Sequence, residues 1–382
     1  MKRITVLLML VLVLPALILS VSGEGLDVPV KSAVLMDVAT GTVLYEKNAH
    51  EALAPASVTK VMTMLLIMEA IDSGALGYGD TVTASEAAAR KGGSQVYLKV
   101  GEQMSVEEML KSIAVSSAND CACAMAEHLS GSEEAFVERM NRKAQELSME
   151  DTHFVNCTGL DDSPEAKNHK TSAYDVALMS RELLGKHPDI RKFTTIWMDT
   201  IRNGAFGLSN TNKLVRFYPG ATGLKTGFTS GAGYCLSASA ERENMELIAV
   251  TMGAESSKIR NAACKTLLDY GFAGFALVSP TLKESAQVPV RLGKEPQVDV
   301  ALQEESSILI PKAQKPGLTT EIQLEECCTA PVEKGTVLGT LTLRSGGKTL
   351  LEVPLVAARG VKRKTFLDQL VLILRKASMA KE

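Results

Sequence analysis

The sequence predicts a mixed α/β domain, a small all-β domain and a C-terminal amphipathic helix. Residues 24–275 mix helical and strand-like patterns, and residues 276–360 form short alternating apolar runs bounded by Pro, Gly or charged residues. Residues 361–382 place their apolar side chains on one side of a helical wheel. A length of 382 residues, with 46% hydrophobic and 22% charged residues, is typical of a globular chain of about two domains.

Residues 1–23 have the pattern of a secretory signal peptide. Lys2 and Arg3 precede an almost wholly apolar run from Ile4 to Val21, which ends in small residues. An uncleaved membrane anchor is the alternative, because the run is close to the ~20 residues that span a bilayer. Both interpretations predict export of the remaining chain.

The charge and the cysteine content argue against two classes of protein. A net charge of −3 is unsuited to binding nucleic acid, which needs a clustered basic surface, so no nucleic-acid partner is expected. The seven cysteines are odd in number and irregularly spaced, so no disulfide framework is predicted, although an isolated disulfide stays open. We interpret most of them as small buried apolar residues.

The pattern of residues 24–275 defines the elements of the mixed domain. Ser105 and Glu108 have the spacing of a capping box, which predicts that a helix starts there. The other predicted elements, in chain order, are a hairpin (32–38 and 42–45), a mostly apolar helix (57–73), helices at 119–129, 133–147 and 172–184, a strand at 245–252 and a helix at 259–270.

The C-terminal third predicts two further units. Within residues 276–360 a hairpin turn is expected at Ser345–Lys348, which contains two glycines, and the domain boundary is placed near residues 273–282. Residues 361–382 carry six basic and two acidic side chains beside an apolar face too short to span a bilayer. They predict a helix on an anionic membrane surface; a helix docked on its own protein is the alternative.

Ser57 and Lys60 are the first candidates for chemistry. Their i, i+3 spacing places them on one face of a helix, with a base within reach of a hydroxyl. The start of a helix also favours a developing oxyanion. For Lys60 to accept a proton its pKa must fall from about 10.4, which burial and neighbouring cations can achieve. The same S-x-x-K pattern recurs at 345–348 and 378–381, so alone it is weak evidence.

Two further motifs strengthen this assignment. Ser117-Ala118-Asn119 and Lys225-Thr226-Gly227 follow Ser57 in that order, 60 and then 108 residues further along. This trio is typical of class A β-lactamases and penicillin-binding proteins. Together with the segments 55–60, 116–120, 156–160 and 223–229, it makes residues 27–360 resemble the low-molecular-weight penicillin-binding proteins, the serine D-alanyl-D-alanine carboxypeptidases of bacterial cell-wall metabolism.

The resemblance implies a catalytic domain of the penicillin-binding and serine β-lactamase type and a set of catalytic roles. Ser57 would attack the carbonyl between two D-alanines, Lys60 would take its proton and Ser117 would relay a proton to the leaving amine. Water would hydrolyse the acyl-enzyme, which releases D-alanine and then the shortened peptide. No metal or organic cofactor is required.

The resemblance also implies the substrate-binding residues. Asn119 would hydrogen-bond the substrate backbone, while Lys225 and Thr226 bind its terminal carboxylate. Gly227 would let the strand pass close to the ligand, and the backbone N–H of Phe228 would complete an oxyanion hole with that of Ser57. Arg260 would be a further basic residue behind the carboxylate site.

The implied partners are peptidoglycan stem peptides ending in D-Ala-D-Ala, and β-lactams as covalent inhibitors. The implied location is the outer face of the cytoplasmic membrane, reached through residues 361–382. Two other functions stay open: a class A β-lactamase, although no E-x-x-L-N pattern lies between the second and third motifs, and a non-catalytic penicillin sensor or wall-binding module. Structurally, Ser117 and Asn119 could simply cap a helix.

Overall fold

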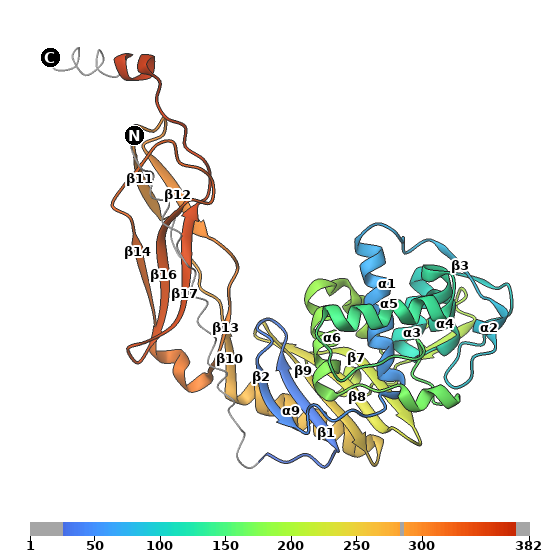
Figure 1. Cartoon of the computed structure of the whole chain (residues 1–382). Helices are drawn as coiled ribbons and strands as arrows, with labels where there is room; N and C mark the ends of the chain where they lie inside the picture. Colours follow the sequence, from blue (N-terminus) through green and yellow to red (C-terminus); the bar gives the residue numbers. More distant parts are fainter. Residues whose placement is uncertain (1–25, 283–285, 372–382) are drawn as a thin grey trace, which may run out of the picture.

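The computed structural model describes residues 26–282 and 286–371. The predicted signal peptide and the last eleven residues of the predicted C-terminal helix lie outside the described residues. Figure 1 shows a large lobe of helices and strands, an elongated β-rich lobe and a short helix at the far end of the latter. The three predicted parts are therefore present in the described chain.

The large lobe is built on a five-stranded antiparallel sheet in the order β2-β1-β9-β8-β7. Its strands are β1 (Ser32–Asp37), β2 (Val43–Lys47), β7 (Ala221–Thr229), β8 (Gly233–Arg242) and β9 (Met245–Ala254). The predicted hairpin and the predicted strand at 245–252 are thus confirmed. Because β7 is an edge strand, its outer side is not paired with another strand of this sheet.

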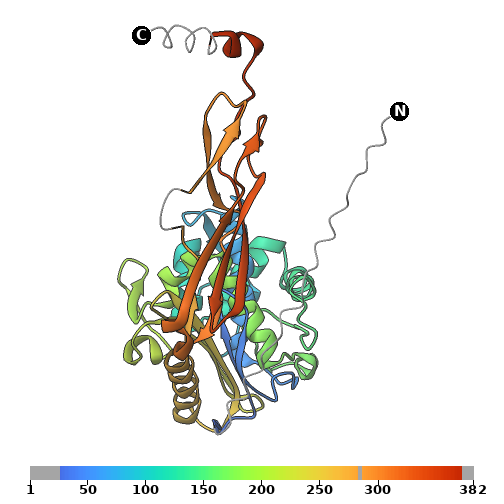
Figure 2. The ribbon, with the colours of Figure 1, turned by 90° about the vertical axis from the view of Figure 1, so that its left-hand side faces the viewer.

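Helices cover both faces of this sheet, so that its side chains enter two separate cores. Val34 and Met36 pack against the helices of one face, whereas Ala33 and Leu35, which alternate with them, pack against α9 on the other. The first face carries α1 (Lys60–Asp72), α3 (Val106–Ser116), α4 (Asn119–Ser130), α5 (Glu133–Glu146) and α6 (Ala173–Lys186), and the second carries α9 (Ser257–Gly274), as Figure 2 also shows.

Two details of the predicted helices differ from the sequence pattern. The helix expected from Ser57 begins with a 3-10 turn, and α1 itself starts at Lys60. Only half of the predicted capping box forms: Ser105 accepts the N–H of Glu108, while the Glu108 carboxylate accepts the N–H of Arg202 instead. A long-range partner therefore replaces the local one.

Short elements fill the rest of the large lobe. The 3-10 turns are η1 (Ala56–Thr59), η2 (Pro164–Asn168) and η3 (Pro188–Ile190), and the short helices are α2 (Glu86–Ala89), α7 (Arg191–Thr194) and α8 (Leu214–Phe217). Two strand pairs complete the lobe: β3 (Thr81–Thr83) with β4 (Gln103–Ser105), and β5 (Met198–Ile201) with β6 (Phe206–Ser209).

The elongated lobe contains a six-stranded sheet in the order β14-β16-β17-β12-β11-β15 and a two-stranded connection, β10 with β13. Gly346 and Gly347 join β16 to β17 with positive φ angles, as the predicted turn requires. The elements are β10 (Phe275–Val278), β11 (Gln287–Arg291), β12 (Gln297–Leu302), β13 (Ile308–Pro311), η4 (Lys312–Gly317), β14 (Leu318–Leu324), β15 (Cys328–Thr329), β16 (Val337–Ser345) and β17 (Lys348–Ala357).

The C-terminal helix begins later than residue 361, where the sequence analysis placed it. Val361 is buried in the core of the β-rich lobe and pairs with Val332, and Arg363 pairs with Gly293. The first helical residue is Phe366. Among the described residues, no helix is both long and apolar enough to cross a membrane.

Candidate active site

Ser57 lies in the 3-10 turn η1, directly before α1. A 3-10 turn repeats every three residues, so that Ser57 and Lys60 share one face as the spacing predicted. The Nζ atom of Lys60 lies 2.9 Å from the Oγ atom of Ser57. Ser57 is half-buried, which leaves its hydroxyl within reach of a ligand, while Lys60 is fully buried.

The burial of Lys60 changes its chemistry. Its Nζ atom also donates to the backbone carbonyl of Thr158, at 2.8 Å. Burial lowers the pKa of Lys60 from its ordinary value to about 7, although the neighbouring groups of Cys157 and Asp120 act in the opposite direction. A large fraction of the Lys60 side chains is therefore neutral near physiological pH and able to accept a proton.

The segment from Asn156 to Leu160 forms a turn against Ser57. The Oδ1 atom of Asn156 accepts the N–H groups of Thr158 and Gly159, and its Nδ2 atom donates to the carbonyl of Leu160. Gly159 has a φ of +79°, and a Cβ atom there would lie 1.8 Å from the carbonyl oxygen of Ala56. The sequence indicated this segment through its resemblance, but nothing in it identified the Thr158 carbonyl as a partner of Lys60.

The second motif lies at the junction of α3 and α4. Ser117 ends α3 in the left-handed conformation, and among the described residues its hydroxyl makes no hydrogen bond. Asn119 begins α4 and donates from Nδ2 to the carbonyl of Gly92, at 2.7 Å, while its Oδ1 atom is buried without a partner in the described chain. Neither side chain caps α4, so the capping alternative does not apply.

The third motif lies on the edge strand β7. Lys225 is buried and donates to the carbonyl of Thr226, whose hydroxyl donates to the hydroxyl of Thr211 at 2.7 Å. Thr211 is a contact that the sequence motifs did not reveal. Gly227 passes so close to η1 that a Cβ atom would lie 2.6 Å from the carbonyl oxygen of Pro55. Gly227 thus lets β7 approach the turn that carries Ser57, whereas the sequence analysis predicted a close approach to the ligand.

Phe228 and Arg260 flank this strand. Phe228 is paired with Tyr234 of β8, and their ring centroids are 4.2 Å apart. Arg260, from α9, is buried and lies over Tyr234 at 5.9 Å. The structure shows no hydrogen bond that connects either residue with Ser57 among the described residues.

The site concentrates positive charge. Burial, together with the charges of Lys60 and Arg260, holds the pKa of Lys225 well below its ordinary value, and burial lowers the pKa of Arg260. Within the described chain none of these three cations forms an ion pair with a carboxylate. An anionic ligand would relieve this repulsion, so the site is suited to a carboxylate beside a serine nucleophile.

Comparisons with known proteins agree with this geometry. A family model described as D-alanyl-D-alanine carboxypeptidase matches residues 20–256, and a model of the C-terminal domain of penicillin-binding protein 5 matches residues 279–363. The D-alanyl-D-alanine carboxypeptidase DacF of Bacillus subtilis is 47% identical over 88% of this chain and 87% of its own length.

The chain belongs to the D-alanyl-D-alanine carboxypeptidase family. It is a serine-type carboxypeptidase, and both the predicted family and the predicted activity are confirmed.

Solved structures of the carboxypeptidase family have the same fold. Penicillin-binding protein 5 from Haemophilus influenzae superposes with a TM-score of 0.73 and 32% identity. The match includes 88% of the present chain and 99% of the Haemophilus influenzae chain. Penicillin-binding protein D2 from Listeria monocytogenes was solved in an ampicillin-bound form and matches with a TM-score of 0.59 and 31% identity. The match includes 65% of the present chain and 98% of the Listeria monocytogenes chain. The predicted fold class is confirmed, including the added β-rich domain.

The turn that contains Gly159 provides a test of the site. In Gly159→Ala the methyl group collides with the Ala56 carbonyl, so the turn has to move and withdraw the Thr158 carbonyl from Lys60. We expect release of D-alanine from a peptide ending in D-Ala-D-Ala to fall by at least about 100-fold. Gly131→Ala is the control, because Gly131 also has a positive φ but has open space around it. Unchanged activity in Gly159→Ala would contradict this role of the turn.

Proposed function

We propose that the chain releases D-alanine from peptidoglycan stem peptides through an acyl-enzyme on Ser57. The neutral Lys60 amine, 2.9 Å away, takes the hydroxyl proton as the Ser57 oxygen attacks the carbonyl between the two D-alanines. The separation of the Lys60 Nζ and Ser57 Oγ atoms carries this proposal, because a neutral amine can accept the hydroxyl hydrogen at 2.9 Å. Ser117, whose hydroxyl is free of other partners in the described chain, passes a proton to the leaving amine. Water then hydrolyses the ester, and the shortened peptide leaves.

Edge strand β7 is proposed to bind the peptide. A chain that ends in D-Ala-D-Ala can lie extended along the outer side of β7, as peptides do on exposed sheet edges. Lys225 and the Thr226 hydroxyl then bind the terminal carboxylate, with Arg260 adding positive charge behind them. The unpartnered Oδ1 atom of Asn119 accepts an N–H group of the substrate backbone. The N–H groups of Phe228 and Ser57 bind the oxyanion.

β-Lactams are proposed to acylate the same serine, because they present a carboxylate and a reactive carbonyl as the peptide does. The ampicillin-bound form of the Listeria monocytogenes relative supports this extension.

Mass spectrometry of the full chain tests the nucleophile and the base. Incubation with a penicillin should give a long-lived adduct on Ser57, and a peptide ending in D-Ala-D-Ala should lose one D-alanine. Lys60→Ala should abolish acylation while the fold is retained, and acylation at a normal rate in this variant would exclude Lys60 as the base. Rapid penicillin turnover with an intact peptide would indicate a β-lactamase, and an adduct without peptide cleavage would indicate a sensor.

The lowered pKa of Lys60 predicts the pH dependence of peptide hydrolysis. Only the neutral amine accepts a proton, and burial brings the pKa of Lys60 to about 7. We therefore expect kcat/KM to rise with pH through about 7 and to fall about tenfold per unit below it. Lys60→Arg, whose side chain stays protonated, is the control and should be inactive throughout. A flat profile between pH 6 and pH 8 would contradict this assignment.

We further infer that the exported enzyme lies peripherally on the outer face of the cytoplasmic membrane, bound through its C-terminal helix. The described helical residues 366–371 expose apolar side chains, with Phe366 79% and Leu367 70% exposed. They lie at the end of the β-rich lobe that is far from the catalytic lobe (Figure 1). The chain would then divide into a signal peptide (1–23), a catalytic domain (24–275), a β-rich domain (276–360, extended to 365 because Val361 lies in its core) and a membrane segment (366–382).

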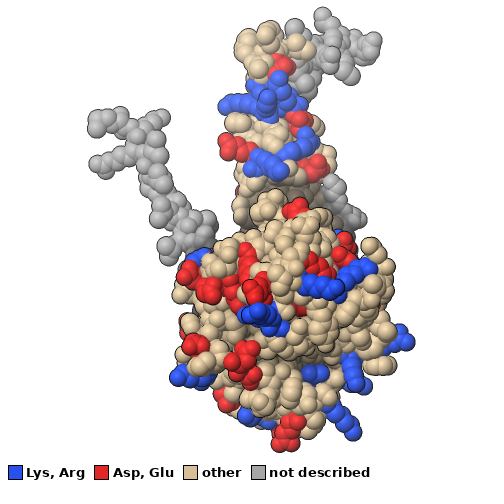
Figure 3. Space-filling model, turned by 90° about the vertical axis from the view of Figure 1, so that its right-hand side faces the viewer, with Lys and Arg blue, Asp and Glu red and all other residues tan. Residues whose placement is uncertain are grey.

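A basic collar borders the helix and supports this location. It comprises Arg291, Lys294, Lys362, Arg363 and Lys364, and backbone hydrogen bonds from Lys294 to Lys362 and from Lys364 to Leu292 join its two segments. Figure 3 shows Lys and Arg side chains gathered near the end of the β-rich lobe that carries the helix. Such a collar attracts anionic lipid headgroups, at about 1 kcal/mol per basic residue.

Vesicle sedimentation tests the membrane segment. The truncation should remove residues 366–382 only, because Val361 is part of the β-rich core. We expect the truncated protein to stay in solution with vesicles of anionic phospholipid, while it releases D-alanine from a soluble peptide at the normal rate. As a second variant, Lys362→Ser, Arg363→Ser and Lys364→Ser together should weaken sedimentation with anionic vesicles more than with neutral ones. Truncated protein that still sediments would exclude the anchor.

A further inference from the structure

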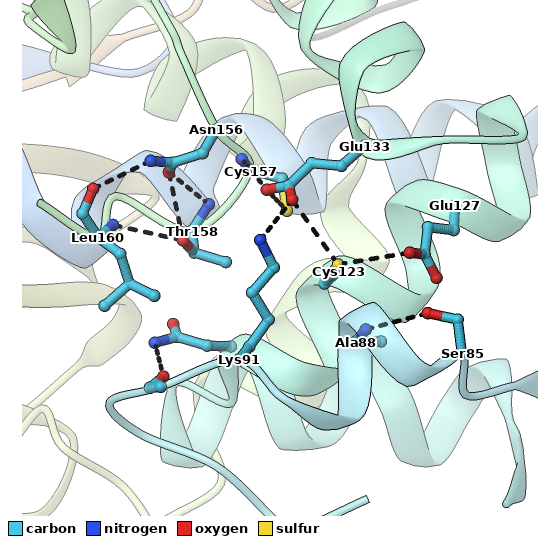
Figure 4. A network of polar contacts seen from close by, with 12 residues as sticks. Ser85, Ala88, Lys91, Cys123, Glu127, Glu133, Asn156, Cys157, Thr158 and Leu160 are labelled. Atoms are coloured by element: carbon cyan, nitrogen blue, oxygen red, sulfur yellow. Dashed lines mark hydrogen bonds and ion pairs between the residues drawn. The ribbon is translucent and has the colours of Figure 1, made fainter. Parts of the chain in front are cut away.

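Glu133 is a half-buried acid close to the active site, and none of the three motifs includes it. It begins α5, and its side chain is 17% exposed. Its Oε2 atom pairs with the Lys91 ammonium at 2.5 Å, and its Oε1 atom accepts both the backbone N–H and the thiol of Cys157, each at 3.2 Å. Figure 4 shows the Glu133 carboxylate between Lys91 and Cys157. We call these three residues the Glu133 bridge.

A favourable charge at the helix start does not explain this burial. Glu134, the next residue, places a carboxylate in the same first turn of α5 while exposed to solvent. Burial by itself would raise the pKa of Glu133, but its interactions with Lys91 and with Cys157 together outweigh burial, and the pKa is lowered. Glu133 is therefore charged, and its partners fix its position.

One end of the bridge reaches Asn119. Lys91 precedes Gly92, whose carbonyl accepts the Nδ2 hydrogen of Asn119, and the carbonyl of Ser94 accepts the backbone N–H of Asn119 at 2.7 Å. The segment from Lys91 to Ser94 is in close contact with Asn119, since a Cβ atom on Gly93 would lie 2.7 Å from the Asn119 Nδ2 atom. The position of Lys91 therefore influences the side chain proposed to bind the substrate backbone.

The other end of the bridge reaches Lys60. The carbonyl of Cys157 accepts the hydroxyl of Thr63 at 2.7 Å, and the next carbonyl, of Thr158, accepts the Nζ hydrogen of Lys60. The backbone N–H that Glu133 accepts is thus one residue away from the partner of Lys60. One carboxylate connects the two backbone segments that hold Lys60 and Asn119.

We propose that Glu133, through its ion pair with Lys91, is a positioning residue that sets Lys60 and Asn119 relative to each other for acylation. This role rests on the proposed function of Ser57 and Lys60. Without the carboxylate, the Lys91 ammonium lacks its counter-ion, and the N–H of Cys157 lacks its acceptor. A cavity of about 190 Å³ adjoins Lys91, Glu133 and Thr158, so that both segments have room to shift.

The proposal predicts which step of the reaction changes. The bridge adjoins the residues that hold Lys60 but not Lys225 or Thr226 of β7, which bind the carboxylate in the proposed function. A shift of the bridge should therefore slow the chemical step far more than it weakens initial binding, because Asn119 is the only proposed binding group that the bridge adjoins. A role in stability alone would lower the unfolding temperature and leave acylation of the folded protein at its normal rate.

Stopped-flow acylation of the full chain with a fluorescent penicillin, far below the unfolding temperature, separates these effects. In Glu133→Gln we expect the saturating acylation rate constant to fall at least about tenfold, and the apparent dissociation constant to change less than threefold. The matched control is Glu134→Gln, which removes the same charge from the same helical turn and should acylate within twofold of the unchanged protein. Acylation of Glu133→Gln at the rate of the control would overturn the proposal.

Variants of Lys91 provide a second test, because Lys91 lies outside α5 and its substitution leaves the sequence of that helix unchanged. Lys91→Met should reduce the acylation rate as Glu133→Gln does, Lys91→Arg should restore most of it, and the double variant should lose no more than either single variant. Additive losses would overturn the proposal. Failure of the unchanged protein to be acylated at Ser57 would refute the proposed function itself, which distinguishes that outcome from a failure of the bridge alone.

Discussion

The burial of the Lys60 amine is the constraint on which the rest of the active site depends. A lysine in water is protonated at neutral pH, and in this protein its removal from water brings the pKa to about 7. That effect requires a surrounding structure that excludes water and still leaves the amine two acceptors, the Ser57 hydroxyl and the Thr158 carbonyl. The strand β7, the turn η1 and the segment 156–160 provide this enclosure, and Gly159 and Gly227 permit their close approach.

Lys225, which is proposed to bind the substrate carboxylate, is buried within range of the Lys60 charge. Burial lowers the pKa of Lys225, and the charges of Lys60 and Arg260 lower it further, so the protonated form of Lys225 is unfavourable without a neighbouring anion. In the proposed function a bound carboxylate would stabilise the protonated form of Lys225, while Lys60 would remain neutral and act as the base. The two lysines would then differ in charge because their partners differ: Lys225 would bind an anion, whereas Lys60 contacts only a hydroxyl and a carbonyl.

The sequence predicts the parts of this arrangement that depend on residue type and local spacing. The hairpin of β1 and β2, the helices, the β-rich domain and the three motifs follow from periodicity and from the resemblance to a family. It does not predict Thr158, because a backbone carbonyl is the same in every residue type. It also does not predict the partners of Thr226 and Glu133, since Thr211, Lys91 and Cys157 approach them only through tertiary packing. Glu133 itself looks like an ordinary first-turn acid in the sequence.

The Glu133 bridge also bears on the difference between this enzyme and a class A β-lactamase, which uses a glutamate to hydrolyse its acyl-enzyme rapidly. Glu133 is a half-buried carboxylate near the Lys60 partner Thr158, and both its oxygens already accept hydrogen bonds, from Lys91 and from Cys157. Burial alone would raise its pKa, but its interactions with Lys91 and Cys157 hold the pKa below the ordinary value, which makes Glu133 a weak base. In the proposed function this carboxylate positions two backbone segments and takes no part in deacylation, which would depend on Lys60 and Ser117.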